Sequence, residues 1–138
     1  MSQIDRSGVR VLVADDDPLL LATVADALTH LGGNVTSAAS GAELIEQMAN
    51  EGPFDLVVTD ISMPWMNGLQ AMQAARTAGL GTSVIFITAL ADERISAQVR
   101  ALGENALLLR KPFDLSQLVA AASELLGRKR TTAVFRNS

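Results

Sequence analysis

The stretch VLVADDDPLL, residues 11–20, joins an apolar run directly to three consecutive carboxylates, Asp15, Asp16 and Asp17. The apolar run at 11–14 is too short for a helix and does not alternate with polar residues, which favours a strand buried on both faces. Asp17 followed by Pro18 is typical of a helix start, because the carboxylate can cap the first turn and proline fits its first position. The stretch therefore predicts a buried strand, then a helix, with an acidic site at their junction.

The same pattern recurs along the chain. Short apolar runs lie at residues 9–14, 34–37, 55–59, 83–88 and 106–109. Apolar residues at helical spacing follow each run, around residues 21–31, 44–48, 69–75, 95–102 and 115–125. This alternation predicts an α/β fold, with a doubly wound five-stranded parallel sheet and five helices on its two faces. In such a sheet, ligands bind beyond the carboxyl ends of the strands.

Local signals indicate where the helices begin and end. An N-cap residue followed three positions later by Glu or Gln predicts a start, and glycine predicts a stop. The predicted starts are Ser40 with Glu43, Asn67 with Gln70, and Asp114 with Gln117, and the predicted stops are Gly32 and Gly33, Gly79, Gly103 and Gly127.

Composition excludes several classes of protein. The chain has 138 residues, of which 49% are hydrophobic, enough for one compact domain with a core. It has no cysteine, which excludes a disulfide framework, a thiolate metal site and a cysteine nucleophile. No apolar run approaches 18 residues and the N-terminus lacks a signal-peptide pattern, so we expect a cytoplasmic protein without membrane contact.

Charge is distributed unevenly. Residues 1–127 carry seven basic and 15 acidic side chains, a net charge of −8, whereas the last eleven residues hold four basic ones. An acidic body argues against direct nucleic-acid binding by this domain. We expect a domain over residues 8–127 and a short basic tail over 128–138 that is disordered or begins a linker.

Residues that can do chemistry follow four of the predicted strands. Asp15 and Asp16 follow the first strand, Asp60 the third, Thr88 ends the fourth, and Lys111 comes just after the fifth. The sheet brings them to one edge, where close carboxylates raise one another's pKa unless a cation offsets their charge. Mg²⁺ suits oxygen ligands and bridges readily to phosphate. A carboxylate can attack phosphorus while a lysine and a hydroxyl orient the phosphoryl oxygens, parts that suit Asp60, Lys111 and Thr88.

Taken one at a time, these residues have simpler interpretations. The acidic pair could be a solvated helix N-terminus, where negative charge complements the helix dipole. Asp60 could be a turn residue before Pro64, Thr88 a β-former and Lys111 a surface charge. The chemical interpretation depends on all of them meeting in space.

Together the residues resemble the receiver domains of two-component response regulators. The matching motifs are the acidic pair in VLVADDDP, DISMPWMNG at residues 60–68, IFITA at 85–89 and KPF at 111–113. They extend over nearly the whole chain in the family's order. The resemblance implies a flavodoxin-like sheet with strand order 2-1-3-4-5. It also implies a signalling domain that catalyses only its own phosphorylation and dephosphorylation and is otherwise not an enzyme.

The resemblance assigns a role to each residue of the acidic edge. Asp60 is expected to accept a phosphoryl group from a phosphohistidine of a partner histidine kinase or phosphotransfer protein. Asp16 is expected to bind Mg²⁺ directly and Asp15 through water, and Asp60 and the main-chain carbonyl of Ser62 complete the protein ligands.

The remaining family features surround the phosphoryl group. Thr88 and Lys111 are expected to contact the phosphoryl oxygens, and Ala89 to leave room for them. The bond between Lys111 and Pro112 is expected to be cis. An effector protein is expected on the face formed by the helix at 95–102, the strand at 106–109 and the helix from 115.

One position departs from the family's pattern. Leu108 lies three residues before the lysine, where receivers commonly carry Tyr or Phe, whose rotation accompanies movement of the hydroxyl toward phosphate. Gly103 also stands one residue further from the lysine than usual. Without the aromatic ring, output could run by helix rearrangement instead.

Two other functions stay open from the sequence. One is a receiver-like interaction module that no longer takes phosphate, which the missing aromatic suggests. The other is a haloacid-dehalogenase-like phosphatase with Asp15 as nucleophile, although no later acidic motif follows Lys111. Trp65 is expected either to contact a partner or to lie partly buried at the site edge. The sequence does not identify the kinase, the output, the lifetime of the phosphorylated state or the oligomeric state, dimers included.

Overall fold

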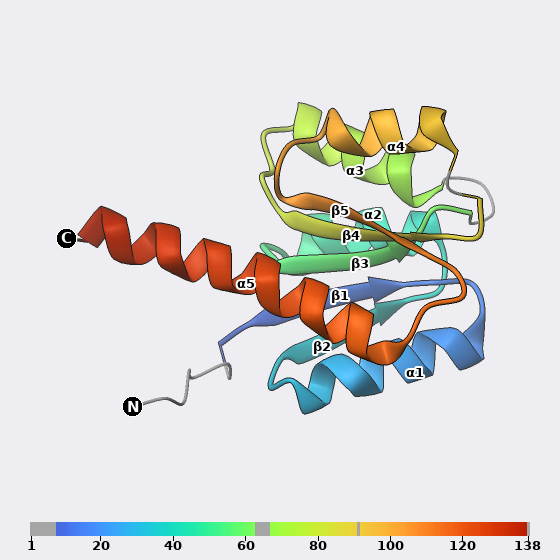
Figure 1. Cartoon of the computed structure of the whole chain (residues 1–138), viewed down its shortest axis with the longest axis horizontal. Helices are drawn as coiled ribbons and strands as arrows, with labels where there is room; N and C mark the ends of the chain where they lie inside the picture. The colour runs from blue at the N-terminus through green and yellow to red at the C-terminus, as the bar shows by residue number, and fades with distance from the viewer. Residues whose placement is uncertain (1–7, 63–66, 91, 138) are drawn as a thin grey trace.

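The five apolar runs form one parallel sheet in the computed structural model, which describes residues 8–62, 67–90 and 92–137, with side chains up to residue 127. The strands are β1 (Arg10–Ala14), β2 (Asn34–Ala38), β3 (Leu56–Asp60), β4 (Ser83–Thr88) and β5 (Ala106–Arg110). Their order is β2-β1-β3-β4-β5, and every pairing is parallel (Figure 1). The predicted fold class and strand order are confirmed, and the predicted strand ends lie within one residue of those observed.

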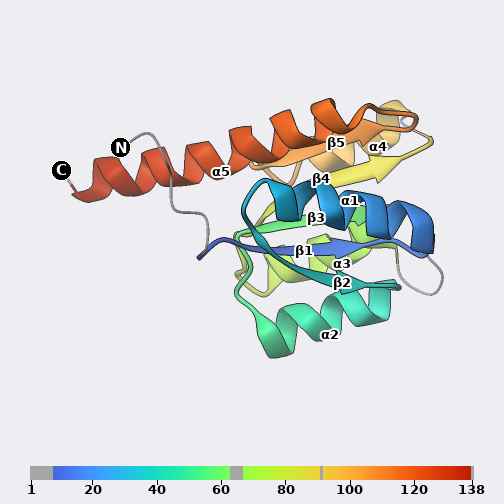
Figure 2. The same ribbon diagram turned by 90° about the horizontal axis from the view of Figure 1, so that it is seen from below.

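Five helices alternate with the strands and cover both faces of the sheet. They are α1 (Pro18–His30), α2 (Gly41–Glu51), α3 (Gly68–Thr77), α4 (Glu93–Arg100) and α5 (Leu115–Asn137). Figures 1 and 2 show α1 and α5 on one face of the sheet and α2, α3 and α4 on the other. Among the described residues, no helix combines the length and the hydropathy that crossing a bilayer requires.

The core consists of two apolar layers, one on each face of the sheet. Alternate residues of the central strands point into opposite layers, so that Val57 packs beneath α2 and α3 while Val58 packs beneath α1 and α5. All residues of β3 and β4 are buried, which explains why these strands read as continuous apolar runs. The helix side chains most fully buried in the two layers are Val24, Leu28, Leu44, Ala71, Met72, Leu118, Ala122 and Leu125.

The predicted helix starts are confirmed by capping contacts. The Asp17 carboxylate accepts hydrogen bonds from the N–H groups of Leu19 and Leu20 at the start of α1. Asn67 and Gln70 form a reciprocal capping box at the start of α3. Two more contacts mark α2 and α5, from Glu43 N to Ser40 Oγ and from Asp114 N to Gln117 Oε1.

Three of the predicted stops are confirmed and one is wrong. Gly32, Gly79 and Gly103 follow α1, α3 and α4 with positive φ, a conformation that glycine adopts without strain. Gly127 lies inside α5, which continues to Asn137 (Figure 1). A glycine inside a helix costs only about 1 kcal/mol relative to alanine, which neighbouring residues can offset. The division into a domain over 8–127 and a tail over 128–138 stays a prediction.

Candidate phosphoryl and metal site

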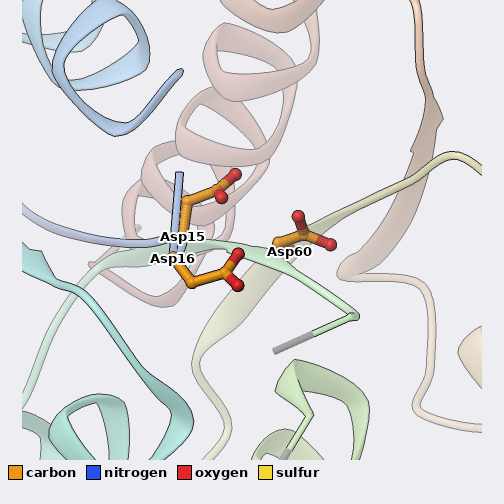
Figure 3. Close-up of side chains that lie close together, drawn as sticks. All are labelled: Asp15, Asp16 and Asp60. Atoms are coloured by element: carbon orange, nitrogen blue, oxygen red, sulfur yellow. The ribbon is translucent and has the colours of Figure 1, made fainter. Parts of the chain in front are cut away.

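Three carboxylates meet at the carboxyl edge of the sheet. Asp15 directly follows β1, where its N–H donates to Ala38 O at 3.1 Å, and Asp60 is the last residue of β3. One oxygen each from Asp15, Asp16 and Asp60 lies within 4.8 Å of the other two (Figure 3). Asp15 and Asp60 are buried, whereas Asp16 is exposed. The predicted acidic cluster is therefore formed by residues 45 positions apart in sequence.

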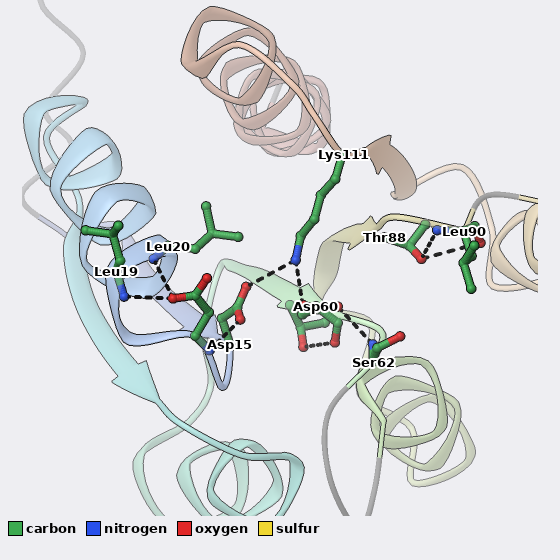
Figure 4. Close-up of polar contacts among 10 residues, drawn as sticks. Asp15, Leu19, Leu20, Asp60, Ser62, Thr88, Leu90 and Lys111 are labelled. Carbon is green, nitrogen blue, oxygen red and sulfur yellow. Dashed lines mark hydrogen bonds and ion pairs between the residues drawn. The ribbon is translucent and has the colours of Figure 1, made fainter.

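Lys111 enters the cluster from the end of β5. Its Nζ donates to Asp60 Oδ2 at 2.8 Å and lies 4.0 Å from Asp15 Oδ2 (Figure 4). The lysine backbone is fixed by a hydrogen bond from Lys111 N to Thr88 O at 2.8 Å. The bond between Lys111 and Pro112 is cis, as predicted.

The electrostatics of the cluster oppose three negative charges. Burial raises the pKa of Asp15, and the charges of Asp60 and Asp16 raise it further, against the Asp17 N–H and Lys111, which lower it. Burial lowers the pKa of Lys111, but its hydrogen bond with Asp60 and the charges of Asp60 and Asp15 outweigh burial and raise the pKa overall. The single ammonium group of Lys111 therefore does not offset the negative charge of three carboxylates.

The donor set fits a hard divalent cation. The cluster offers three carboxylate oxygens within 4.8 Å of one another and no nitrogen or sulfur ligand among them. Oxygen-only sites suit Mg²⁺ or Ca²⁺ rather than zinc or copper. The Ser62 main chain lies beside the same carboxylates, because Ser62 N donates to Asp60 Oδ1 at 2.9 Å.

Thr88 lies at the same edge of the sheet but does not contact the carboxylates. Its hydroxyl accepts from Leu90 N at 3.1 Å and donates to Leu90 O at 3.4 Å. Figure 4 shows this hydroxyl turned toward Leu90 rather than Asp60. The acidic pair, Asp60 and Lys111 are thus brought together as predicted. The fourth group, the Thr88 hydroxyl, is instead held by the chain segment that follows β4.

Hydrogen bonds that the sequence did not predict fix the backbone around Asp60 on several sides. The Thr59 hydroxyl, fully buried, donates to Asp60 O at 3.0 Å. Ile61 N donates to Ile87 O at 2.9 Å, and Gly68 N donates to Ile61 O at 3.1 Å. The available signal was the threonine directly before the expected nucleophile, at a position that is usually apolar in a fully buried strand.

Asp17 has a second function besides capping. Its N–H donates to Asp15 Oδ1 at 2.9 Å, while its carboxylate caps α1. The third acid of the opening stretch therefore orients the first one through the backbone. The sequence predicted the cap but not the contact with Asp15.

Leu108 is partly buried and packs against the apolar layer that lies beneath α2, α3 and α4. In β5 it pairs with Phe86 of β4, so the leucine fills the place where the family's aromatic residue is expected. Ala89 is exposed beside Thr88. Trp65 and the interpretation given to it lie outside the described residues.

A family model described as the response regulator receiver domain matches residues 11–123. Among curated proteins, the chain is 35% identical over 136 residues to the probable transcriptional regulatory protein TcrX of Mycobacterium tuberculosis, covering 97% of this chain and 56% of that protein. It is 35% identical over 122 residues to a probable chemotaxis protein CheY of Rhizobium etli, covering 86% of this chain and 93% of that one. The chain thus spans about half the length of TcrX and most of the length of this CheY.

Solved structures give a similar result. The chain superposes with a TM-score of 0.78 and 26% identity on a chain of the CheX-CheY-BeF3-Mg+2 complex from Borrelia burgdorferi, covering 85% of this chain and 88% of that chain. This similarity concerns the fold.

Proposed function

Because this chain belongs to the response regulator receiver domain family, we propose that Asp60 accepts a phosphoryl group from a phosphohistidine of a partner histidine kinase or phosphotransfer protein. A receiver domain is a phosphoacceptor in signal transduction and not an enzyme acting on other substrates. The observation that carries the assignment to Asp60 is its hydrogen bond with Lys111 inside a cluster of three carboxylates.

In the proposed reaction, a carboxylate oxygen of Asp60 attacks phosphorus. An O–P bond forms, the P–N bond to the imidazole breaks, and the leaving nitrogen keeps the electron pair and takes up a proton from water. Lys111, already 2.8 Å from Asp60 Oδ2, is placed to neutralise negative charge on the transferred oxygens. In dephosphorylation, water attacks phosphorus and the O–P bond to Asp60 breaks.

We propose Mg²⁺ as the cofactor, held by Asp15, Asp16, Asp60 and the main-chain carbonyl of Ser62. When bound, the ion supplies positive charge against the carboxylates and the phosphoryl oxygens. The oxygen-only donor set supports this choice. Burial first, and then the charges of Asp60 and Asp16, raise the pKa of Asp15, so a cation at this place would favour its charged form. A similar fold carries Mg+2 in the CheX-CheY complex.

Thr88 has to change partner to take part. Its hydroxyl donates its one proton to Leu90 O, so donation to a phosphoryl oxygen requires that this bond break. The proposal therefore couples phosphorylation to movement of the segment after β4. Leu108 provides no ring to rotate behind the hydroxyl, so this segment and α4 are the proposed route of output.

The proposed effector contact is the face formed by α4, β5 and α5. An acidic body supports a protein effector rather than direct contact of this domain with nucleic acid. Because a histidine kinase draws its phosphoryl group from ATP, the proposed site of action is the cytoplasm. We also propose output through a further domain, because this chain covers only 56% of the related protein TcrX.

The direct test is chemical mapping of the phosphorylated residue. The protein is incubated with acetyl phosphate and Mg²⁺, and the acyl phosphate is reduced with borohydride and located by mass spectrometry. We expect the label on Asp60 and its loss in Asp60→Asn. Asp26→Asn is the matched control, since this carboxylate is exposed on α1, away from the acidic cluster, and its loss should leave labelling unchanged.

Each other outcome supports a different function. Label on Asp15 would support the phosphatase alternative, in which this residue is the nucleophile. A folded protein without label, and without change on adding beryllofluoride, would support a phosphorylation-independent interaction module. Either result would overturn the assignment of Asp60.

A further inference from the structure

The residue before the proposed phosphoacceptor holds the acceptor's own backbone. Thr59 lies two positions after Val57 in β3, so strand alternation places its side chain on the face covered by α2 and α3, opposite to that of Asp60, and Gly68 of α3 lies against it. A hydroxyl buried in an apolar layer needs a hydrogen-bond partner. Here the Thr59 hydroxyl donates to Asp60 O at 3.0 Å, so its partner is the carbonyl of the residue that takes the phosphoryl group.

The start of α3 packs closely against both the Thr59 hydroxyl and the Asp60 carbonyl. A Cβ atom at Gly68 would lie 2.4 Å from Asp60 O and 2.5 Å from Thr59 Oγ1. Only glycine therefore lets the helix approach this closely, and the helix encloses the hydrogen bond between Thr59 and Asp60. Thr59 is fully buried, so the contact is shielded from water.

The peptide group between Asp60 and Ile61 is consequently held at both ends. Its carbonyl accepts from the Thr59 hydroxyl, and its N–H donates to Ile87 O at 2.9 Å. The orientation of this peptide determines where the next residue lies. In the following peptide, Ser62 N donates to Asp60 Oδ1 at 2.9 Å, so the held peptide lies between the carboxylate and the main-chain group that contacts it.

We propose that Thr59 is a positioning residue for phosphoryl transfer, fixing the Asp60 carboxylate and the Ser62 main chain through the peptide between them. The inference rests on the proposed function of Asp60. Thr59 touches no phosphoryl oxygen, since its side chain lies on the other face of the strand. Because a misplacement of about 1 Å can lower a rate about 100-fold, a change in this peptide should reduce transfer even in a folded protein.

The test compares variants that remove or keep the hydroxyl. Thr59→Val has nearly the same shape but no donor, and Thr59→Ser keeps the donor. Thr77→Val is the matched control, because Thr77 on α3 also donates to a backbone carbonyl, Gln73 O, but is exposed. We measure the rate of Asp60 labelling at saturating and subsaturating acetyl phosphate, with Mg²⁺ in excess.

A second readout uses the metal-free protein. The amide resonance of Ser62 and its hydrogen-exchange rate report directly on the contact with Asp60 Oδ1. In Thr59→Val we expect the maximal rate to fall about tenfold and the Ser62 amide to shift and exchange faster. In Thr59→Ser and Thr77→Val both should stay close to wild type.

The outcomes separate this inference from the proposed function. A Thr59→Val protein that is less stable but keeps the wild-type maximal rate and Ser62 amide would show a merely structural threonine and overturn the inference alone. If the wild type carries no label on Asp60, the proposed function fails and the inference with it. Should Thr59→Val not fold, Thr59→Ala removes the same donor without a methyl group near Asp60 O, and a wild-type rate there would equally overturn the inference.

Discussion

Asp15 is a residue whose burial opposes folding when no cation is present. It is 2% exposed, and burial, together with the charges of Asp60 and Asp16, raises its pKa. When the pKa of a carboxyl group is higher in the folded than in the unfolded state, the free energy of unfolding falls as the pH rises from the unfolded pKa through the folded one. The same residue is proposed to bind Mg²⁺, so the cost at this position is tied to function.

In the metal-free protein, Asp15→Asn should therefore increase stability. The amide can still accept the Asp17 N–H but carries no charge, so we expect a gain on the order of 1 kcal/mol at neutral pH. The gain should shrink as the pH falls toward 3.8, the ordinary value for this carboxyl, where the wild-type residue becomes protonated in the unfolded state as well. Urea unfolding in chelator at several pH values measures this difference.

Magnesium should reverse the order of the two proteins. A ligand at about 100 times its Kd stabilises the folded state by about 2.7 kcal/mol, which the wild type gains and Asp15→Asn largely loses. Asp26→Asn serves as the control, with wild-type behaviour in both conditions. A variant less stable than wild type in chelator would contradict the view that Asp15 is held at a cost.

At the scale of elements, α3 is the helix most closely fitted to the site. Its first residue, Gly68, donates its N–H to Ile61 O and lies against Thr59 and Asp60. Its last turn carries Arg76, whose guanidinium donates to Leu102 O, Leu80 O, Thr82 O and Asn105 Oδ1. One end of α3 thus fixes the phosphoacceptor strand, and the other ties the connections before β4 and β5 together.

Gly68→Ala should be strongly destabilising for a steric reason. The new Cβ would lie 2.4 Å from Asp60 O, so α3 has to move away from β3. We expect a loss of roughly 2–3 kcal/mol in unfolding free energy and slower labelling of Asp60. Gly81→Ala is the control, because a Cβ there meets nothing within 4 Å and should change stability by less than about 0.5 kcal/mol. Similar stabilities for both variants would refute this packing argument.

Arg76→Met should disconnect the far end of α3. The variant keeps most of the apolar stem but removes four hydrogen bonds, two of them at 2.6 and 2.9 Å, so we expect a loss of roughly 2–4 kcal/mol. Arg94→Met, on the exposed surface of α4, is the matched control and should be nearly neutral. Chemical denaturation of both variants measures the difference, and a near-neutral Arg76→Met would mean that water replaces the lost contacts.

At the scale of the whole molecule, α5 is longer than the sheet that it covers. Among the side chains described for α5, which reach residue 127, the last buried ones are Leu125 and Leu126, and the helix backbone continues to Asn137. Figures 1 and 2 show this continuation extending beyond the sheet and the other helices. The helix α5 is thus continuous across residue 127, where the sequence predicted the end of the domain.

A chain ending after Gly127 should fold and accept phosphate nearly as well as the whole chain. We expect the unfolding free energy to change by less than about 1 kcal/mol, because all the buried side chains that the structure describes lie before Gly127. Leu125→Ala, which removes a side chain that is 1% exposed, should cost about 2–5 kcal/mol by comparison. If truncation costs as much as Leu125→Ala, the predicted domain boundary at residue 127 is wrong.

The sequence by itself determined the fold class, the strand order through its family resemblance, and the residues of the acidic edge. The fold class and the acidic edge follow from local information: apolar runs indicate strands, helical spacing indicates helices, and alternation indicates a parallel sheet whose strand ends share an edge. Cap residues such as Asp17 and Asn67 act within a few positions of themselves, so they too are readable from the chain. The stop predicted at Gly127 failed because a single glycine is a weak signal inside a long helix.

Only the tertiary structure decided how the site is held. The close approach of Gly68 to Asp60 O and the hydrogen bonds from Arg76 to three backbone carbonyls depend on the relative placement of those carbonyls. A carbonyl is present at every residue, so no residue type marks the one that a side chain will meet. The side-chain chemistry of the site could therefore be predicted from the sequence, whereas the backbone contacts that position these side chains exist only once the chain has folded.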